Sequence, residues 1–300
     1  MAAAKKVYIA EVGPRDGWQN HPVQIPTATK IKYIKKMADC GAKKMELTSF
    51  VSPKYVPQMA DAALVYAGVK DYLAEKEVLP VALTLNAKGV ENARKAGFDH
   101  VVFVLSASEV HNLRNSRRTI EQSLEIFKEQ ARHAAGMKIT LAMPCAFGSP
   151  FGDDVPADRI KRLIDEAEKV GVSEFGLADT AGISTPEHTD YLLREVKRYT
   201  DTDKLIVHLH DTYGMGLVNS YVALMEGVTK METSLAGMGG CPFVPGAKGN
   251  IATEDLVYML ESMGIETGYD LDLLNETAAE MSAEIQAVPA SCQSRLCAHA

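Results

Sequence analysis

The chain has 300 residues, of which 46% are hydrophobic and 24% are charged. This composition is typical of a globular protein with a large buried core, and it excludes disordered and collagen-like classes. The formal net charge of −7 argues against a basic surface that binds phosphate backbones, so we expect no nucleic-acid partner.

Residues 1–6 lead directly into an apolar strand pattern, without the apolar segment and cleavage site of a secretory signal. No apolar stretch approaches the roughly 20 residues that are needed to cross a bilayer. The five cysteines are odd in number and irregularly spaced, as expected of thiols that are kept reduced. We therefore expect a cytoplasmic protein without a membrane partner.

Short β-rich apolar runs alternate with longer segments of helical period from residue 7 to about residue 260. Strands are expected over 7–12, 44–48, 79–84, 100–105, 138–143, 174–178, 205–210 and 230–235. Helices are expected between them, among others over 28–40, 120–134, 157–170, 186–199 and 217–227. One or two further helices are expected within 262–289.

Eight strands with intervening helices close most simply into a (β/α)8 TIM barrel of the α/β class. The alternative is an open doubly wound sheet, which usually carries a glycine-rich phosphate loop after its first strand; residues 11–16, EVGPRD, are not such a loop. No linker divides the chain. We expect a single catalytic barrel domain over 1–289 with extra C-terminal helices, followed by a flexible tail over 290–300.

Polar residues gather where several expected strands end, which is the face on which barrel enzymes build their active sites. Arg15 and Asp16 follow the first strand, Glu46 lies in the second, and a His208-Leu209-His210 sequence ends the seventh. Residues two apart on a strand point to the same face, so the histidines can present two imidazoles to one ion. With Asp16 as a third donor, the pattern predicts a metal site for Mg²⁺ or Mn²⁺, while Zn²⁺ and Fe²⁺ remain open.

Residues 237–250, GMGGCPFVPGAKGN, are predicted to form a glycine- and proline-rich loop after the eighth strand. Cys241 at its centre is either a proton-transfer group or a small residue in a turn. Asn250 is either a metal ligand or the cap of the following helix. Glu46 is either a proton relay beside the metal or a structural partner of a cation such as Arg15.

Four separated motifs occur in the order in which a known family carries them, at residues 11–17 (EVGPRDG), 48–54 (TSFVSPK), 207–214 (VHLHDTYG) and 239–242 (GGCP). Together they resemble the 3-hydroxy-3-methylglutaryl-CoA lyase family, and the likeness runs from about residue 7 to residue 275. The first and third motifs are shared with isopropylmalate and homocitrate synthases. The cysteine loop and residues 249–257 narrow the resemblance to the lyase branch.

The resemblance implies a divalent-metal-dependent lyase that cleaves a carbon–carbon bond in an acyl-CoA, with acetyl-CoA and acetoacetate as products of the parent substrate. It also implies a homodimer. It assigns the residues as follows: Asp16, His208, His210 and Asn250 to Mg²⁺ or Mn²⁺, Arg15 to the thioester enolate, Glu46 and Cys241 to proton transfer, and Arg15 and Gln19 to substrate contacts.

Three departures from this family bear on the identity of the substrate. Trp18 stands where a leucine is expected, and Thr140 and Ala142 stand where an arginine and a tyrosine usually occur. The alternatives are therefore a lyase for a different acyl-CoA with a tertiary hydroxyl group, or a synthase that condenses acyl-CoA with a 2-oxo acid. A catalytically inactive barrel is a third alternative, but it predicts disrupted metal positions, and none is disrupted.

Overall fold

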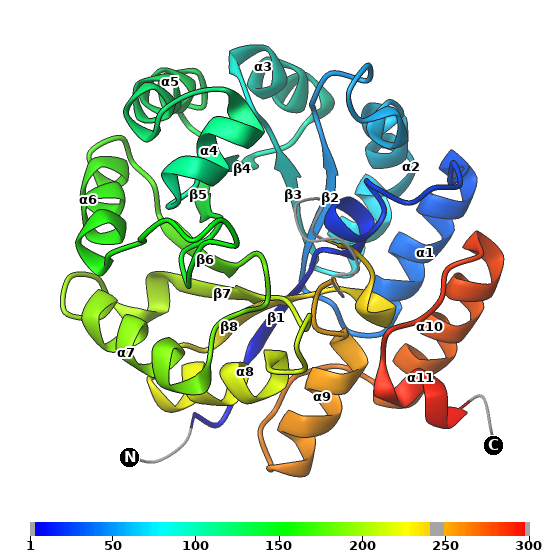
Figure 1. Cartoon of the computed structure of the whole chain (residues 1–300). Helices are drawn as coiled ribbons and strands as arrows, with labels where there is room; N and C mark the ends of the chain where they lie inside the picture. The colour runs from blue at the N-terminus through cyan, green and yellow to red at the C-terminus, as the bar shows by residue number, and fades with distance from the viewer. Residues whose placement is uncertain (1–3, 241–248, 298–300) are drawn as a thin grey trace.

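The computed structural model describes residues 4–240 and 249–297. Eight parallel strands form a closed barrel in the order β1 to β8, surrounded by a ring of helices (Figure 1). The strands are β1 (Tyr8–Glu11), β2 (Lys44–Ser49), β3 (Leu79–Leu83), β4 (His100–Val104), β5 (Lys138–Met143), β6 (Glu174–Asp179), β7 (Leu205–Leu209) and β8 (Lys230–Thr233). The predicted (β/α)8 barrel is confirmed.

The helices between the strands follow the expected alternation. They are α1 (Thr27–Asp39), α2 (Ala62–Glu75), α3 (Ala87–Ala96), α4 (Glu109–Ser116), α5 (Ile120–His133), α6 (Ala157–Glu168), α7 (Pro186–Val196) and α8 (Gly216–Met225). Local sequence sets several of their starts. Thr119 and Gln122 form a capping box at α5, and Asn86 caps α3.

Side chains alternate across each strand between the barrel interior and the helices. Phe103 on β4 packs edge-on against Phe127 of α5, at a ring distance of 5.8 Å, and so belongs to the outer layer. Thr140 on β5 and Glu174 on β6 instead meet inside the barrel, where the Thr140 hydroxyl donates to Glu174 at 3.2 Å. The large apolar core therefore lies between the sheet and the helices, and the interior carries polar groups.

The end of the first strand differs from the prediction. Strand β1 stops at Glu11, and Gly13–Gly17 form η1, a single π-helical turn that carries Arg15 and Asp16. The proline at the second position of this turn fits an N-terminal helical position. The two predicted site residues thus lie on a short helical turn and not on a strand.

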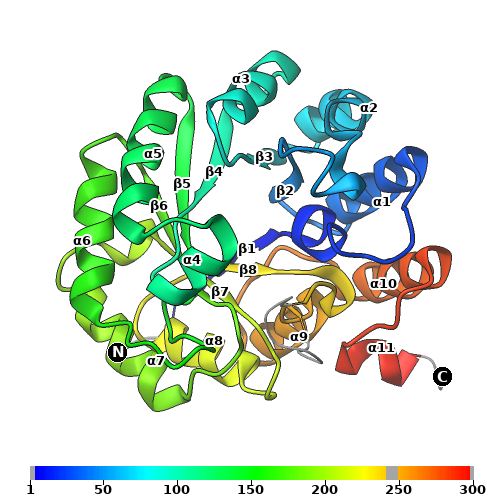
Figure 2. The same ribbon diagram turned by 45° about the horizontal axis from the view of Figure 1, so that its top comes forward.

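Three helices follow the barrel: α9 (Thr253–Ser262), α10 (Leu271–Ile285) and α11 (Cys292–Cys297). Figures 1 and 2 both place α10 beside α1, and α11 beside α9 and α10. The expected tail over 290–300 therefore contains a helix, because the Asp255 carboxylate of α9 accepts the backbone amides of Cys292 at 2.8 Å and Gln293 at 2.9 Å. Within the described residues, no helix has the length and apolar character that a membrane crossing requires.

Candidate active site

A buried glutamate fixes the turn that carries Arg15 and Asp16. Glu11 is 1% exposed, and its Oε1 accepts the backbone amides of Gly13 at 2.7 Å and Leu235 at 3.0 Å. A Cβ atom at Gly13 would lie 2.6 Å from that oxygen, so a side chain at Gly13 would push the glutamate away. Burial raises the pKa of Glu11 to about 7 despite these bonds. One carboxylate thus joins η1 to the segment after β8.

Arg15 and Glu46 form a two-pronged ion pair inside the barrel mouth. Arg15 Nε donates to Glu46 Oε1 at 2.8 Å and Arg15 Nη2 donates to Glu46 Oε2 at 2.9 Å. Burial raises the pKa of Glu46, although the charge and hydrogen bonds of Arg15 oppose that shift. This pairing leaves one guanidinium nitrogen, Nη1, for Asp16 at 2.5 Å. The guanidinium is therefore held in one orientation by two carboxylates.

The two predicted histidines of β7 and its end face each other. His208 Nε2 and His210 Nε2 lie 3.2 Å apart. On the other side of the His208 ring, Nδ1 lies 3.0 Å from Glu232 Oε2. Despite burial, the hydrogen bond and charge of Glu232 raise the pKa of His208. In the neutral ring the bond to Glu232 keeps the proton on Nδ1, so that Nε2 offers its lone pair to a ligand. Burial and the neighbouring His208 lower the pKa of His210 to about 4, which keeps its ring neutral near pH 7.

Asn250, in the segment before α9, lies beside His210. It pairs with His210 in an isolated antiparallel bridge, flanked by hydrogen bonds from Asp211 N to Gly249 O and from Ile251 N to Leu209 O. The residue that caps α9 is Ala252, so Asn250 is not the helix cap. Its Nδ2 donates to Asp16 Oδ2 at 2.7 Å and to the backbone oxygen of Met238 at 3.0 Å.

Asp16 lies at the centre of these contacts. In addition to Arg15 and Asn250, Gln19 Nε2 donates to Asp16 Oδ1 at 3.2 Å. Burial alone would favour the neutral acid, but the Arg15 charge and the nearby histidines hold the pKa of Asp16 at about 2. The carboxylate is therefore ionised at any physiological pH.

The donor set fits a divalent cation. One ligand atom each of Asp16, His208 and His210 lies within 4.8 Å of the others. The Oδ1 atom of Asn250 is buried and has no hydrogen-bond partner, as expected of an oxygen reserved for an ion. Three carboxylates lie among these residues: those of Asp16 and Glu46 pair with the guanidinium of Arg15, and that of Glu232 pairs with His208. A cation would compensate the excess negative charge.

Replacing Glu232 by glutamine is expected to weaken metal binding about 10–100-fold, because a neutral amide is a weaker acceptor for His208 Nδ1 and, as a donor as well as an acceptor, no longer fixes the tautomer of the ring. Titration calorimetry with Mn²⁺ measures the change. The matched control is Glu226→Gln, which removes a carboxylate that pairs with Lys197 and Arg194 near the outer helices. Wild-type Mn²⁺ affinity in Glu232→Gln would show that Glu232 does not position His208.

The structure brings most of the predicted site residues into one cluster: Arg15, Asp16, Gln19, Glu46, His208, His210 and Asn250. Cys241 lies outside the described residues. Sequence reasoning missed Glu232 and the buried anchor Glu11. An acidic residue at an inward position of β8, the strand beside His208, is the signal that could have identified Glu232.

The three departures from the family pattern lie in different environments. Trp18 is 1% exposed and belongs to the apolar core cluster, so its indole presents no open surface to a substrate. Thr140 is also buried, and its hydroxyl lies 2.9 Å from His100 Nε2 inside the barrel. Ala142 is half-buried and lies nearer the mouth. Ala142 is therefore the departure that a substrate can meet.

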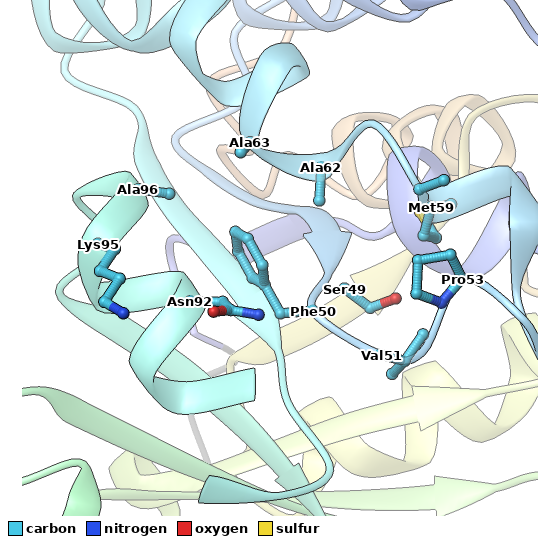
Figure 3. Close-up of a pocket in the computed structure, with 11 residues that line it drawn as sticks. Ser49, Phe50, Val51, Pro53, Met59, Ala62, Ala63, Asn92, Lys95 and Ala96 are labelled. Carbon is cyan, nitrogen blue, oxygen red and sulfur yellow. The ribbon is translucent and has the colours of Figure 1, made fainter. Parts of the chain in front are cut away.

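A separate cavity of about 400 Å³ lies on the outer side of the barrel, between the β2–α2 connection and α3 (Figure 3). Phe50 and Ser49 line it from the end of β2, and Asn92 and Lys95 line it from α3. Ala63 borders it from the start of α2. None of the metal-site residues lines this cavity.

A closed (β/α)8 barrel with a candidate divalent-cation site at the carboxyl ends of its strands defines the class of this protein. The family model described as HMGL-like matches residues 6–281, and the chain belongs to this family. It is a carbon–carbon lyase.

The chain is 40% identical to hydroxymethylglutaryl-CoA lyase of Bacillus subtilis over 280 residues, which cover 93% of each chain. It is 42% identical to the mitochondrial hydroxymethylglutaryl-CoA lyase of Bos taurus over 277 residues, 92% of this chain and 84% of the other. A solved structure of an HMG-CoA lyase from Acinetobacter baumannii, in complex with coenzyme A and 3-methylmalate, matches with a TM-score of 0.92 and 35% identity, covering 98% of this chain and 96% of the other.

Proposed function

We propose that this protein cleaves 3-hydroxy-3-methylglutaryl-CoA to acetyl-CoA and acetoacetate. The observation that carries the proposal is the cluster of Asp16, His208, His210, Arg15 and Glu46 in the barrel mouth of a chain that belongs to the HMGL-like family. The names of the relatives point to the same substrate. The bound coenzyme A in the Acinetobacter baumannii structure supports an acyl-CoA as the ligand class.

Asp16, His208, His210 and Asn250 would hold Mg²⁺ or Mn²⁺. The mixture of carboxylate, amide and imidazole ligands supports one of these ions with water in the remaining positions. When bound, the ion supplies positive charge that polarises the oxygens of the substrate. Gln19 keeps Asp16 oriented through the hydrogen bond to its Oδ1, and we expect its amide to lie beside the substrate.

Arg15 would stabilise the negative charge that develops during cleavage. The hydroxyl group on C3 loses its proton, the C2–C3 bond breaks, and C3 becomes the ketone carbon of acetoacetate. The electron pair of the broken bond moves into the thioester enolate, which takes a proton at C2 to give acetyl-CoA. A guanidinium that is already fixed by Glu46 and Asp16 needs no reorganisation to meet this charge.

Glu46 and Cys241 would transfer the two protons. The raised pKa of Glu46 makes it a better proton acceptor than an ordinary exposed carboxylate. Cys241 lies two residues after Gly239, where a Cβ atom would lie 2.6 Å from Asn250 Nδ2 and 3.4 Å from Asp16 Oδ2. Between them, the two groups would remove the hydroxyl proton and return a proton to C2.

Replacing Cys241 by alanine is expected to lower kcat by about 10²–10⁴-fold, the usual contribution of a general acid or base. Mn²⁺ affinity should not change, because the thiol is not one of the proposed ligands. Steady-state kinetics with a parallel Mn²⁺ titration measure both quantities. Cys292→Ala, at an exposed free cysteine, is the control. Unchanged kcat in Cys241→Ala would remove the thiol from the mechanism.

The experiment that tests the proposed function is product analysis with purified protein. We expect acetyl-CoA and acetoacetate in equal amounts from 3-hydroxy-3-methylglutaryl-CoA, and no free coenzyme A from acetyl-CoA mixed with 2-oxo acids. Release of free coenzyme A in the second mixture would instead indicate a condensing synthase. The homodimer is part of the proposal, and light scattering should give twice the 32.6 kDa of one chain. A cytoplasmic location also stays a prediction.

A further inference from the structure

The wall of the barrel mouth that faces the catalytic cluster is small and apolar. In the closed order of eight strands, β5 lies across the barrel from β1, and β6 lies across from β2. Asp16 and Arg15 follow β1, and Glu46 lies on β2. The substrate must therefore fit between this cluster and the inward side chains of β4, β5 and β6.

Three neighbouring positions form this surface, which we call the lumen wall: Val104, Ala142 and Gly176. Val104 pairs with Ala142, and Ala142 pairs with Gly176, so the three lie side by side across β4, β5 and β6. The alternate residues Phe103 and Leu141 belong to the outer apolar layer. The lumen wall consequently faces the interior.

Space remains in front of this wall. Val104 and Ala142 are only half-buried, although both lie inside the barrel. Gly176 lies within β6 and its backbone φ is outside the left-handed region, so the strand conformation does not demand glycine. A Cβ atom there would make ordinary contacts, the nearest at 3.5 Å from Ala142 Cα. Gly176 is itself buried, so glycine at this position leaves room for a methyl group beside the half-buried Ala142.

The charged groups below the wall are already paired. Glu174 accepts Lys44 Nζ at 2.6 Å, Lys230 Nζ at 2.7 Å and the Thr140 hydroxyl at 3.2 Å. No residue of the lumen wall carries a charge or a hydrogen-bonding side chain. The wall thus offers nothing to a carboxylate, whereas it can bury an alkyl group.

We propose that the lumen wall receives the alkyl substituent on the tertiary carbon of the substrate and accepts a substituent larger than methyl. The substrate class is 3-hydroxy-3-alkylglutaryl-CoA with a short linear chain such as propyl. This inference rests on the proposed function and uses the same reaction. The C2–C3 bond of the propyl substrate breaks to give acetyl-CoA and 3-oxohexanoate. As with the methyl substrate, the C3 hydroxyl group loses a proton and C2 gains one.

The test compares kcat/KM for the propyl and methyl substrates under identical conditions with Mn²⁺. We expect the propyl substrate to be at least as good as the methyl substrate in the wild-type protein. Ala142→Leu and Gly176→Val fill the space in front of the wall and should lower the propyl-to-methyl ratio at least tenfold, since one methylene in an apolar pocket changes kcat/KM by about 10–200-fold. Two variants are used because one of them can fail to fold.

Ala63→Leu is the matched control, because it makes the same kind of substitution beside the outer cavity of Figure 3. It should leave the propyl-to-methyl ratio unchanged. A wild-type preference of tenfold or more for the methyl substrate, or an unchanged ratio in the folded wall variants, would overturn the inference while the proposed function stands. Cleavage of neither substrate would refute the proposed function and this inference with it.

Discussion

Replacing Asp16 by asparagine is expected to abolish measurable divalent-metal binding and to lower turnover by about 10³-fold or more. The reason is that Asp16 is the one carboxylate among the proposed ligands, and it also anchors Asn250 through a 2.7 Å hydrogen bond. An amide in its place removes the negative charge and gives Asn250 no acceptor of equal strength. Mn²⁺ titration and steady-state kinetics on the same preparation measure the two effects.

The matched control for this substitution is Asp153→Asn. Asp153 accepts hydrogen bonds from Ser108 and Ser149 in the connections after β4 and β5, away from the proposed ligands. It should retain wild-type Mn²⁺ affinity. If Asp16→Asn bound Mn²⁺ as tightly as the wild type, the ion would have to lie elsewhere in the protein.

Replacing Arg15 by glutamine should lower kcat by about 10²–10³-fold, the loss typical of removing one donor to a developing anion. Metal binding should not weaken in this variant. The guanidinium lies 2.5 Å from Asp16, so its positive charge opposes a cation there, and its removal favours the ion if anything. The opposite effects on metal affinity separate the role of Arg15 from that of Asp16.

Stability should also fall in Arg15→Gln, because Glu46 is 5% exposed and would lose its ion-pair partner. Breaking a buried pair from one side costs about 3–5 kcal/mol, which urea unfolding monitors. Arg15→Lys is the comparison variant. It keeps the positive charge and loses the two-pronged geometry, so its kcat should lie between that of the wild type and that of Arg15→Gln. Wild-type kcat in Arg15→Gln would rule out enolate stabilisation by Arg15.

The parts of this protein that sequence reasoning predicted correctly rest on local periodicity. Strand and helix periods alternate so regularly that the barrel follows from them. The two-residue spacing of His208 and His210 predicts that both side chains share a face, and the structure places their Nε2 atoms 3.2 Å apart. Both inferences need only the alternation of side chains along a strand.

The parts that could not be predicted depend on contacts between distant segments. Asn250 is preceded and followed by residues that suit a helix start. Only the structure shows that Ala252 caps α9 and that Asn250 forms a bridge with His210, which removes the cap alternative and leaves the predicted ligand role. The π-helical turn at Arg15 is fixed by Glu11 and the distant amide of Leu235, which no local pattern reveals. The helix α11 likewise depends on Asp255, which lies 37 residues before Cys292.

The contact between Glu232 and His208 could not be predicted from the sequence for a related reason. Within β8, Lys230 and Glu232 alternate with apolar Met231, a pattern that equally describes a solvated strand. Its contact with His208 becomes visible only when β7 is paired with β8 and His208 lies opposite Glu232. A carboxylate that orients a histidine is therefore visible only after the strands are placed in register.

The most direct test of the account is acetoacetate release from 3-hydroxy-3-methylglutaryl-CoA by metal-stripped protein, followed by titration with Mn²⁺ or Mg²⁺. We predict no release from the stripped protein and full recovery at one ion per chain, with turnover of Asp16→Asn staying about 10³-fold or more below the wild type at every metal concentration. Undiminished acetoacetate release from protein that contains no bound metal, or no release after full metal loading, would contradict a metal-dependent lyase centred on Asp16, His208 and His210.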